Sequence, residues 1–567
     1  MITTTIVIIV ALAIWLSGFY FYSPKIEKVL NPQPDRPTPA VMFRDGVDFY
    51  PAKPTILFGD HWAAISGGAP LANGVVGLQW GFIPLAIWLW CGSVFCGAVH
   101  DYSVLYMSVR RRGDSIGRLA TDVLGPVGGK IFTFYAWITV VIMNAIFIIF
   151  LGKIFSGTPV VVIPSWFGFM VSGPLIGWLV YKRGVRVSIA TIIAIIWIFI
   201  TLWLGFLFPI KAPYWVWWLA WGIYPMISAS IPAWWMIEPR NYSNFVMMAI
   251  GVALLFISAL IGWYPVRFPL VRAFYSEIHG PMLPLLVVVV SCGAMSGLHA
   301  VWCSGYTSKR IANELHTRLI GYGLFPTIVR RGGFLLESLT ASSTMLCCLV
   351  LSWDEFFPLF KKHWMAAAST GYARIVGGVT GIPSEVLYAW CMFWLSCFIV
   401  TTMDGGNRAA RILIVDLYSM IRPVKRAAAA RWAGSIVSML CALAISVTGT
   451  WLVLYPMFGA TMLMVGALSL GVIVVWLKLT SRRLFYHGWL WVFILSFCFA
   501  TFIWNIYYYS ALKFNPILCA LAVVLLVLVT YLAYITIKRF KTLTKEEIEK
   551  WTAEEAWPKK EATSTTS

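Results

Sequence analysis

Long apolar segments recur along the whole chain, and they restrict its fold more than any other feature. Sixty per cent of the residues are hydrophobic, 12% are charged and the mean hydropathy is +0.80. A water-soluble globule could not bury so much apolar surface, whereas a helix of about 20 such residues crosses a bilayer. The segments lie at about residues 4–23, 55–79, 84–108, 130–151, 158–181, 187–209, 214–235, 244–264, 282–304, 333–352, 384–403, 432–450, 454–477, 488–508 and 514–536. We predict an all-α polytopic membrane protein with about fifteen transmembrane helices.

The basic residues are divided unevenly between the two sides of the membrane. When the connections between the predicted helices are taken alternately, 35 of the 43 lysines and arginines fall on one side. Cytoplasmic loops carry the excess of basic residues, so this asymmetry places the N-terminus outside and the C-terminus in the cytoplasm. The net charge of +20 is then explained by membrane topology, and we expect no nucleic-acid partner.

Motifs for enzyme chemistry are missing from the sequence. All eleven cysteines lie in apolar segments, where thiols behave as small hydrophobic groups, and their spacing fits neither a disulfide framework nor a zinc site. The sequence has no phosphate-binding loop and no nucleophile motif. We therefore expect no enzyme activity, no metal and no cofactor beyond a coupling ion, H⁺ or Na⁺.

The second apolar segment carries residues that a continuous membrane helix would not tolerate. The ionisable pair Asp60 and His61 is followed by Gly67 and Gly68, with Pro70 two residues later. Proline removes a backbone donor and glycine loosens the helix, and irregular backbone at membrane depth persists only where protein or a watery cavity satisfies it. Close helix packing of small residues is the alternative interpretation. We predict a discontinuous helix with a buried ligand site at the break.

A second interruption, Gly222–Pro232, lies five segments later in a helix of opposite direction. Two discontinuous helices in this relation are typical of the inverted five-plus-five repeat of LeuT-like transporters, the APC superfamily. Residues 55–408 would form this core, with repeats at about 55–209 and 214–403. The other parts would be a first helix with a cytoplasmic loop, accessory helices, and a partly disordered cytoplasmic tail: residues 1–54, 409–537 and 538–567.

A third flexible stretch, Ser291–His299, lies in the ninth apolar segment. In folds with this repeat, the corresponding helix faces the first broken helix across a cation site. The small residues Gly293 and Gly297 fit close helix packing equally well. Both interpretations stay open at this stage.

Few ionisable residues fall at membrane depth, where an unpaired charge is costly. They are Asp60, His61, His100, Asp101, Glu238, His299, Glu337 and Asp404. Asp101 and Asp404 lie near arginines in the sequence and, with Glu337, are candidates for structural or gating charges. Histidine changes its charge near neutral pH, so His61 and His299 are candidates for proton coupling, although neutral buried histidines would fit as well.

Six short motifs occur in order between residues 38 and 408. They are Thr38–Val41 with Asp45–Phe49, Gly59–Leu71 with Arg110–Gly113, Gly97–Tyr102, Pro232–Trp235 with Pro239–Tyr242, Cys292–Ala300 with Ser304–Lys309, and Thr401–Asp404 with Arg408. Together they resemble the carbon starvation (CstA-type) transporter family, whose members take up peptides and, in some branches, pyruvate with protons. The resemblance implies a multi-pass protein of the bacterial inner membrane that serves the stress response to carbon starvation.

The chain departs from this family pattern beside the predicted site. Asp60 stands where the first histidine of a His-His pair is usual, His100 where glutamine is usual, and Asn241 where aspartate is usual. Cys303 and Tyr306 replace small hydroxyl residues. Because these changes border the site, the substrate and the coupling ion remain open.

We expect secondary active uptake of a small carboxylate-bearing nutrient, a short peptide or a 2-oxo acid such as pyruvate. Helix N-termini attract anions, so the substrate-binding residues are expected at the two breaks: Ser66, Gly67, Gly68, Ala69, Ser228 and Ser230. Hard cations prefer oxygen ligands and histidines carry protons, which gives these candidates for cation or proton coupling: Asp60, His61, Ala64, Ile65, Ser291, Ser296 and His299. A membrane sensor that binds the nutrient without net transport is the alternative. The sequence leaves the oligomeric state open.

Overall fold

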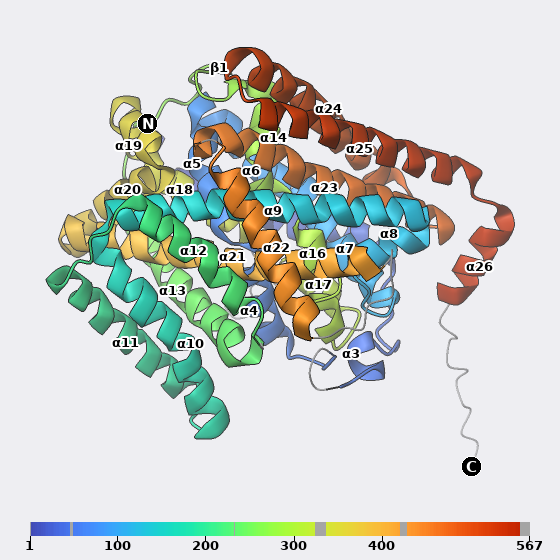
Figure 1. Ribbon diagram of the computed structural model, residues 1–567, viewed down its shortest axis with the longest axis horizontal. Coiled ribbons are helices and arrows are strands. Elements are labelled where there is room, and N and C mark those ends of the chain that lie inside the picture. Colours follow the sequence, from blue (N-terminus) through green and yellow to red (C-terminus); the bar gives the residue numbers. More distant parts are fainter. Residues whose placement is uncertain are drawn as a thin grey trace.

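Helices make up almost all of the regular structure in the computed structural model (Figure 1). The structure describes residues 2–45, 49–231, 233–323, 336–419, 428–448 and 450–555, and at some of these positions, Asp60 and Glu337 among them, only the backbone. Within these residues one small sheet pairs β1 (Tyr275–Ser276) with β2 (Gly280–Pro281) antiparallel, with Tyr275 opposite Pro281.

Thirteen α-helices precede the sheet and thirteen follow it in the described residues. The first group is α1 (Thr4–Ser17), α2 (Ser23–Leu30), α3 (Pro39–Met42), α4 (Pro54–Ile65), α5 (Gly68–Val76), α6 (Phe82–Gly92), α7 (Ala98–Arg110), α8 (Ile116–Leu124), α9 (Pro126–Gly157), α10 (Met170–Gly177), α11 (Val187–Leu207), α12 (Tyr214–Ser228) and α13 (Ala233–Gly262). The second group is α14 (Met282–Val289), α15 (Ser291–Ala294), α16 (His299–Cys303), α17 (His316–Gly321), α18 (Leu336–Leu349), α19 (Trp353–Lys362), α20 (Trp364–Thr380), α21 (Ser384–Ser419), α22 (Ala428–Ser446), α23 (Trp451–Leu479), α24 (Phe485–Tyr507), α25 (Pro516–Thr542) and α26 (Lys545–Glu555).

Ten helical stretches of the described residues are long and apolar enough to cross a membrane. They are Thr4–Leu30, Phe82–Arg110, Pro126–Gly157, Pro159–Val180, Ser188–Leu207, Pro239–Gly262, Ser384–Ser419, Trp451–Leu479, Phe485–Leu512 and Pro516–Thr542. Two shorter apolar helices are Ser338–Leu349 and Arg431–Ser446. The chain is therefore a multi-pass membrane protein.

Ten of the fifteen predicted segments correspond to these long stretches. The other five are the three interrupted segments and the two shorter helices. A break divides a segment into pieces that are each too short to cross alone: α4 has 12 residues, α5 has nine and α12 has 15, against the 20 or so that a bilayer needs. The total of fifteen and the five-plus-five repeat stay predictions.

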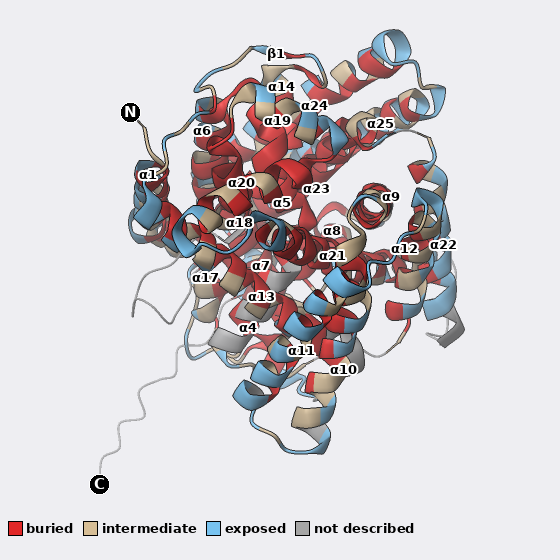
Figure 2. Cartoon of the chain, turned by 90° about the vertical axis from the view of Figure 1, so that its left-hand side faces the viewer, coloured by how far each residue is buried: buried red, intermediate tan, exposed pale blue. Residues whose placement is uncertain are grey.

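The centre of the molecule is formed by α9, α21 and α23. The apolar stretch of α23 is buried inside the protein. The assignment of residues 409–537 as accessory helices stays a prediction. Figure 2 shows the buried residues concentrated at the centre, while α10 and α11 carry many exposed ones. The exposed side chains of α11 include Ile192, Ile196 and Trp203, which suit contact with lipid.

Outside the ten long stretches, α19 begins with a reciprocal cap. The Glu355 N–H donates to Ser352 Oγ at 3.3 Å, and the Ser352 N–H donates to the Glu355 carboxylate at 2.9 Å. Arg374 donates to both oxygens of the same carboxylate, at 3.0 and 3.1 Å. The bonds from Arg374 and Ser352 lower the pKa of Glu355 from 4.5 to about 2.

We expect α19 to loosen in acid. A carboxylate with a lowered pKa stabilises the folded state above its unfolded value of 4.5, and this contribution disappears as the pH falls to about 2. The effect is below about 1 kcal/mol because Glu355 is partly exposed. Hydrogen exchange in residues 353–362, corrected for intrinsic rates, should rise across this window in the wild type and change less in Glu355→Gln. Equal pH dependence in the two proteins would contradict the assignment.

Candidate functional site

The predicted break in the second apolar segment is present between α4 and α5. The helix ends at Ile65, and the chain passes through Ser66 and an extended Gly67 before α5 begins at Gly68. Ser66 is fully buried, and its hydroxyl has no hydrogen-bond partner in the described residues. A buried hydroxyl without a partner is costly, so Ser66 offers an unused polar group at the break.

Thr402 of α21 packs directly against this break. The Gly68 N–H donates to Thr402 Oγ1 at 3.1 Å, and a Cβ on Gly67 would lie 1.7 Å from the same oxygen. Only glycine allows so close an approach. Two of the residues predicted to bind substrate lie here. The Gly68 N–H already has a hydrogen-bond partner in the protein, and Ala69 is buried.

The second interruption lies between α12 and α13 and borders a buried ion pair. Arg240 of α13 pairs with Asp404 of α21, and both side chains are fully buried. Ser228, at the end of α12, donates to Asp404 Oδ1, and Tyr224 donates to Oδ2 at 3.1 Å. Ser230 donates to the Met226 carbonyl at 2.7 Å. The two serines predicted to bind substrate thus both have partners within the protein.

A second buried carboxylate, Asp101 of α7, lies between two imidazoles. His100 Nδ1 is 2.7 Å from Asp101 Oδ1, and His299 Nδ1 is 2.8 Å from Asp101 Oδ2. His100 Nε2 lies 2.7 Å from the hydroxyl of Ser469, on α23. All four residues are at most 3% exposed. Arg110, the arginine nearest to Asp101 in the sequence, instead pairs with Glu314.

His61 adds a third imidazole to this region. Its Nδ1 lies 2.9 Å from Thr307 Oγ1, and its Nε2 lies 3.9 Å from the Cys303 thiol, one turn of α16 after His299. The first broken helix, α7 and the ninth apolar segment therefore meet at ionisable side chains. Asp60, Ala64 and Glu337 are predicted site residues whose side chains lie outside the description.

The third flexible stretch is also interrupted, between α14, α15 and α16. Asn73 of α5 connects the break to its neighbours: its amide donates to the Val289 carbonyl and to the Tyr455 hydroxyl, each at 2.7 Å. The Gly293 N–H donates back to Asn73 Oδ1 at 2.7 Å. Ser291 and Ser296, predicted cation ligands, are buried, and so is Ile65 at the first break. Ser296 Oγ lies 3.6 Å from the Cys292 thiol.

Asn73 was not among the predicted site residues, nor were Thr402, Ser469 and Tyr455. A polar amide inside an apolar segment is a signal that the sequence offered for Asn73, because such groups are rare at membrane depth unless paired. The hydroxyl residues offer a weaker signal, since serine and threonine commonly bond to their own helix. Their role depends on which distant helix they meet.

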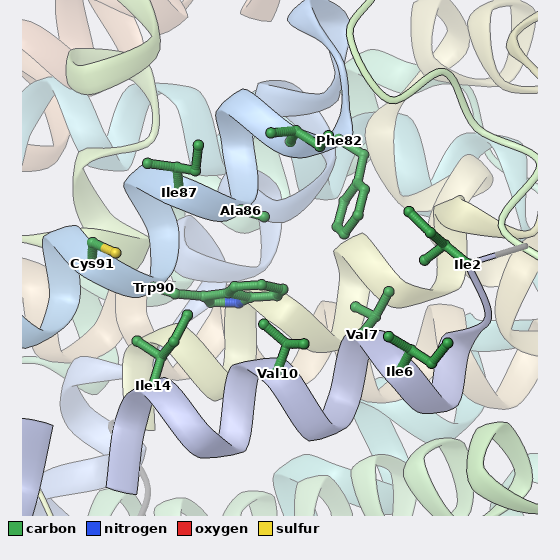
Figure 3. A pocket seen from close by; sticks show the side chains of 11 residues that line it. Ile2, Ile6, Val7, Val10, Ile14, Phe82, Ala86, Ile87, Trp90 and Cys91 are labelled. Carbon is green, nitrogen blue, oxygen red and sulfur yellow. The ribbon is translucent and has the colours of Figure 1, made fainter. Parts of the chain in front are cut away.

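A cavity of about 270 Å³ lies elsewhere, between α1 and α6 (Figure 3). Its lining is aliphatic and aromatic, including Ile6, Val10, Phe82 and Trp90. A carboxylate would find no charged partner among these side chains. We therefore place the candidate site at the breaks and not in this cavity.

Comparison with known proteins identifies the family. The family model for carbon starvation protein CstA matches residues 3–371 and 362–504. The chain is 30% identical to a peptide transporter CstA of Mycobacterium tuberculosis H37Rv, over 72% of this chain and 61% of the relative. It is 26% identical to the peptide transporter CstA of Escherichia coli K12, over 82% of this chain and 75% of that protein. These relatives are named as transporters and not as enzymes.

Two further comparisons extend this picture. The chain is 29% identical to the pyruvate/proton symporter BtsT of Escherichia coli K12, over 62% of this chain and 50% of the symporter. A solved manganese transporter of Eremococcus coleocola is similar over 90% of this chain and 99% of its own, with 10% identity and a TM-score of 0.46. On the family match, this chain belongs to the CstA carbon starvation family.

Proposed function

We propose that the chain is a secondary transporter of the bacterial inner membrane that imports a small carboxylate-bearing nutrient together with protons during carbon starvation. The substrate would be a short peptide or a 2-oxo acid such as pyruvate. Both choices are supported by the names of relatives, peptide transporter and pyruvate/proton symporter. The uneven distribution of basic residues supports an N-terminus outside and a C-terminus in the cytoplasm.

The observation that carries the proton assignment is the contrast between the two buried carboxylates. Asp404 pairs with Arg240, whose guanidinium stays protonated at every physiological pH. Asp101 instead contacts two histidines, His100 and His299, and histidine is the side-chain type that most often carries protons in proteins. Of these two described carboxylates, Asp101 is therefore the one whose partners can exchange a proton during a transport cycle. We assign proton coupling to Asp101 and a structural or gating role to Asp404.

A proton cycle at this cluster would alter its hydrogen bonds. An ionised carboxylate only accepts, so Asp101 holds an N–H from each imidazole. When Asp101 takes up a proton, its negative charge disappears and both bonds lose their charge assistance. His299 lies at the start of α16, just after the break that follows α15, and His61 lies on α4, the first half of the first broken helix. Protonation can thus change how firmly α7 holds the elements that form the breaks.

We place the substrate carboxylate at the first break. The Ser66 hydroxyl, which has no partner among the described residues, would donate to it, and the Gly68 N–H would exchange Thr402 Oγ1 for a carboxylate oxygen. The positive end of α5 favours an anion at this point. Ser228 and Ser230 would contribute from the second break after releasing their present partners.

Ser66→Ala should weaken substrate binding. A hydrogen bond to a charged group contributes about 1.5–3 kcal/mol, so KM should rise about tenfold or more with little change in the maximal rate. The matched control is Ser172→Ala, since the Ser172 hydroxyl bonds to its own helix at the Phe169 carbonyl. Initial rates of pyruvate and dipeptide uptake by proteoliposomes measure both. An unchanged KM in Ser66→Ala would remove this residue from the site.

The decisive test of the proposed function compares driving forces. Purified protein in proteoliposomes should accumulate radiolabelled pyruvate or alanyl-alanine under an inward proton gradient, and competition between the two should reveal which binds. An equal response to an inward sodium gradient would favour oxygen ligands near Ala64, Ile65, Ser291 and Ser296 over the histidine cluster. Binding without accumulation under either gradient would favour a membrane nutrient sensor.

A further inference from the structure

The last described helix, α26, packs back against the protein after a short turn that follows α25 (Figure 1). Its 11 residues include five glutamates and two lysines, in a chain whose net charge is +20. The Arg111 guanidinium lies 4.1 Å from the centre of the Trp551 ring. Glu555 is only 5% exposed. A buried carboxylate needs partners, and those of Glu555 come from three separate parts of the chain.

Glu555 binds one tryptophan and three arginines. Trp476 Nε1 donates to its Oε1 at 2.8 Å, and Arg482 donates to its Oε2 at 3.0 Å. Arg110 Nε lies 3.6 Å from Oε2, and the Glu555 carbonyl accepts from Arg36 at 2.9 Å and from Arg110 at 3.4 Å. One residue thus ties the loop before α3, the end of α7 and the turn after α23 together.

A second carboxylate, Glu314, completes the same cluster from the other side. It lies 3.3 Å from Arg110 and 3.9 Å from Arg36, and it accepts the Gln33 N–H at 2.7 Å. Burial and the neighbouring Arg110 lower the pKa of Arg36, which reflects how closely the arginines are crowded. Without Glu555, Glu314 would have to offset this repulsion between Arg36 and Arg110.

These partners lead to the proposed coupling site. Arg110 ends α7, the same helix that carries Asp101 nine residues earlier, roughly 14 Å along the axis. Glu314 belongs to the segment that follows α16, and Thr307 of that segment contacts His61. The cluster therefore holds two elements whose inner ends meet at Asp101 and His299.

We propose that α26 is an intramolecular latch. Glu555 contacts Arg36, Arg110 and Arg482 and so holds α26, the end of α7 and the turn after α23 together. The segment 543–544 is the hinge, because it is the connection between α25 and α26. The contacts are largely ionic, and because Glu555, Arg110 and Glu314 are buried, salt screens them less than it screens exposed pairs. Releasing the latch frees the end of α7 and speeds transport. The expected change in transport rate rests on the proposed function, whereas the latch itself does not.

The test uses Glu555→Gln in the full-length protein, with Glu549→Gln as the matched control because Glu549 is an exposed glutamate of the same helix. Hydrogen exchange is measured by mass spectrometry in residues 545–555, 104–112 and 307–316. Initial uptake of pyruvate and alanyl-alanine is measured at about 0.05 and about 0.5 M salt. We expect Glu555→Gln to exchange at least tenfold faster in all three segments and to transport severalfold faster at low salt. The difference should persist at high salt, because the ion pairs that Glu555 makes are buried.

Several outcomes would overturn the latch. Exchange in Glu555→Gln that matches Glu549→Gln would show that the charge of the Glu555 carboxylate does not hold α26 in place. Faster exchange with slower or unchanged uptake would make α26 a structural support instead. If the wild type transports neither substrate, the proposed function fails, while the exchange comparison still decides whether the latch exists.

Discussion

Asp101→Asn is expected to abolish accumulation driven by a proton gradient while leaving exchange of substrate across the membrane. Asparagine keeps the size of the side chain and can bond to His100 and His299, but it cannot carry the negative charge or the proton. Positioned proton-transfer groups commonly contribute about 100-fold or more, and we expect a loss of that size. Accumulation and counterflow of radiolabelled pyruvate or alanyl-alanine in proteoliposomes separate the two processes.

Two further substitutions make this result interpretable. Asp114→Asn, which alters a carboxylate beside Arg118 at the surface, should behave like the wild type in both assays. Asp404→Asn should lose accumulation and exchange together, because it leaves the buried Arg240 without its carboxylate. Full accumulation by Asp101→Asn would show that Asp101 does not carry the coupled proton, and it would favour sodium as the coupling ion.

Gly297→Ala is expected to damage both stability and transport. A Cβ at this position would lie 2.1 Å from the Gly466 nitrogen and 2.2 Å from the Met462 carbonyl oxygen. Both are backbone atoms of α23, so no rotamer change can make room, and the helix must move away. Overpacking of this kind costs about 1–3 kcal/mol. We expect a lower unfolding temperature and at least tenfold slower uptake.

Gly405→Ala is the control for this substitution. The nearest atoms to its Cβ belong to the Trp302 ring, at 3.7 Å, which is ordinary contact. It should therefore retain wild-type stability and uptake. If the two variants behave alike, the close approach of α23 to the stretch between α15 and α16 does not matter for the protein.

The breaks could be predicted from sequence because they break a local rule. Gly67, Gly68 and Pro70 weaken the helix wherever they occur in an apolar segment, and the structure indeed ends α4 at Ile65. Family membership could also be predicted, since its motifs are short and ordered. These features depend on neighbours in the sequence and need no knowledge of the tertiary fold.

The partners of the site residues could not be predicted in this way. Arg110 is near Asp101 in the sequence, yet at nine residues along one helix the two side chains are far apart, and Arg110 pairs with Glu314. Asp404 is likewise paired with Arg240, from a helix more than 160 residues earlier. Which helices lie side by side is a property of packing, and no local pattern contains it.

The same limit applied to the last part of the chain. The composition of α26 is that of a solvated charged segment, and we expected a partly disordered tail. The described part of this tail contains a short helix, α26, and its last residue, Glu555, is buried among arginines contributed by distant segments. A charged helix can bury one of its carboxylates only when the surface that it packs against carries the complementary charge.

The central position of α23 has a consequence for how the protein is made. Ser469 and Tyr455 of α23 contact His100 and Asn73, which are synthesised more than 350 residues earlier. During insertion into the membrane, the ribosome therefore completes every helix of the proposed repeats before these two partners exist. The hydrogen bonds of His100 and Asn73 to α23 therefore form only after α23 has entered between helices that are already in the bilayer. Until then, other protein groups or water must occupy the positions of Ser469 and Tyr455.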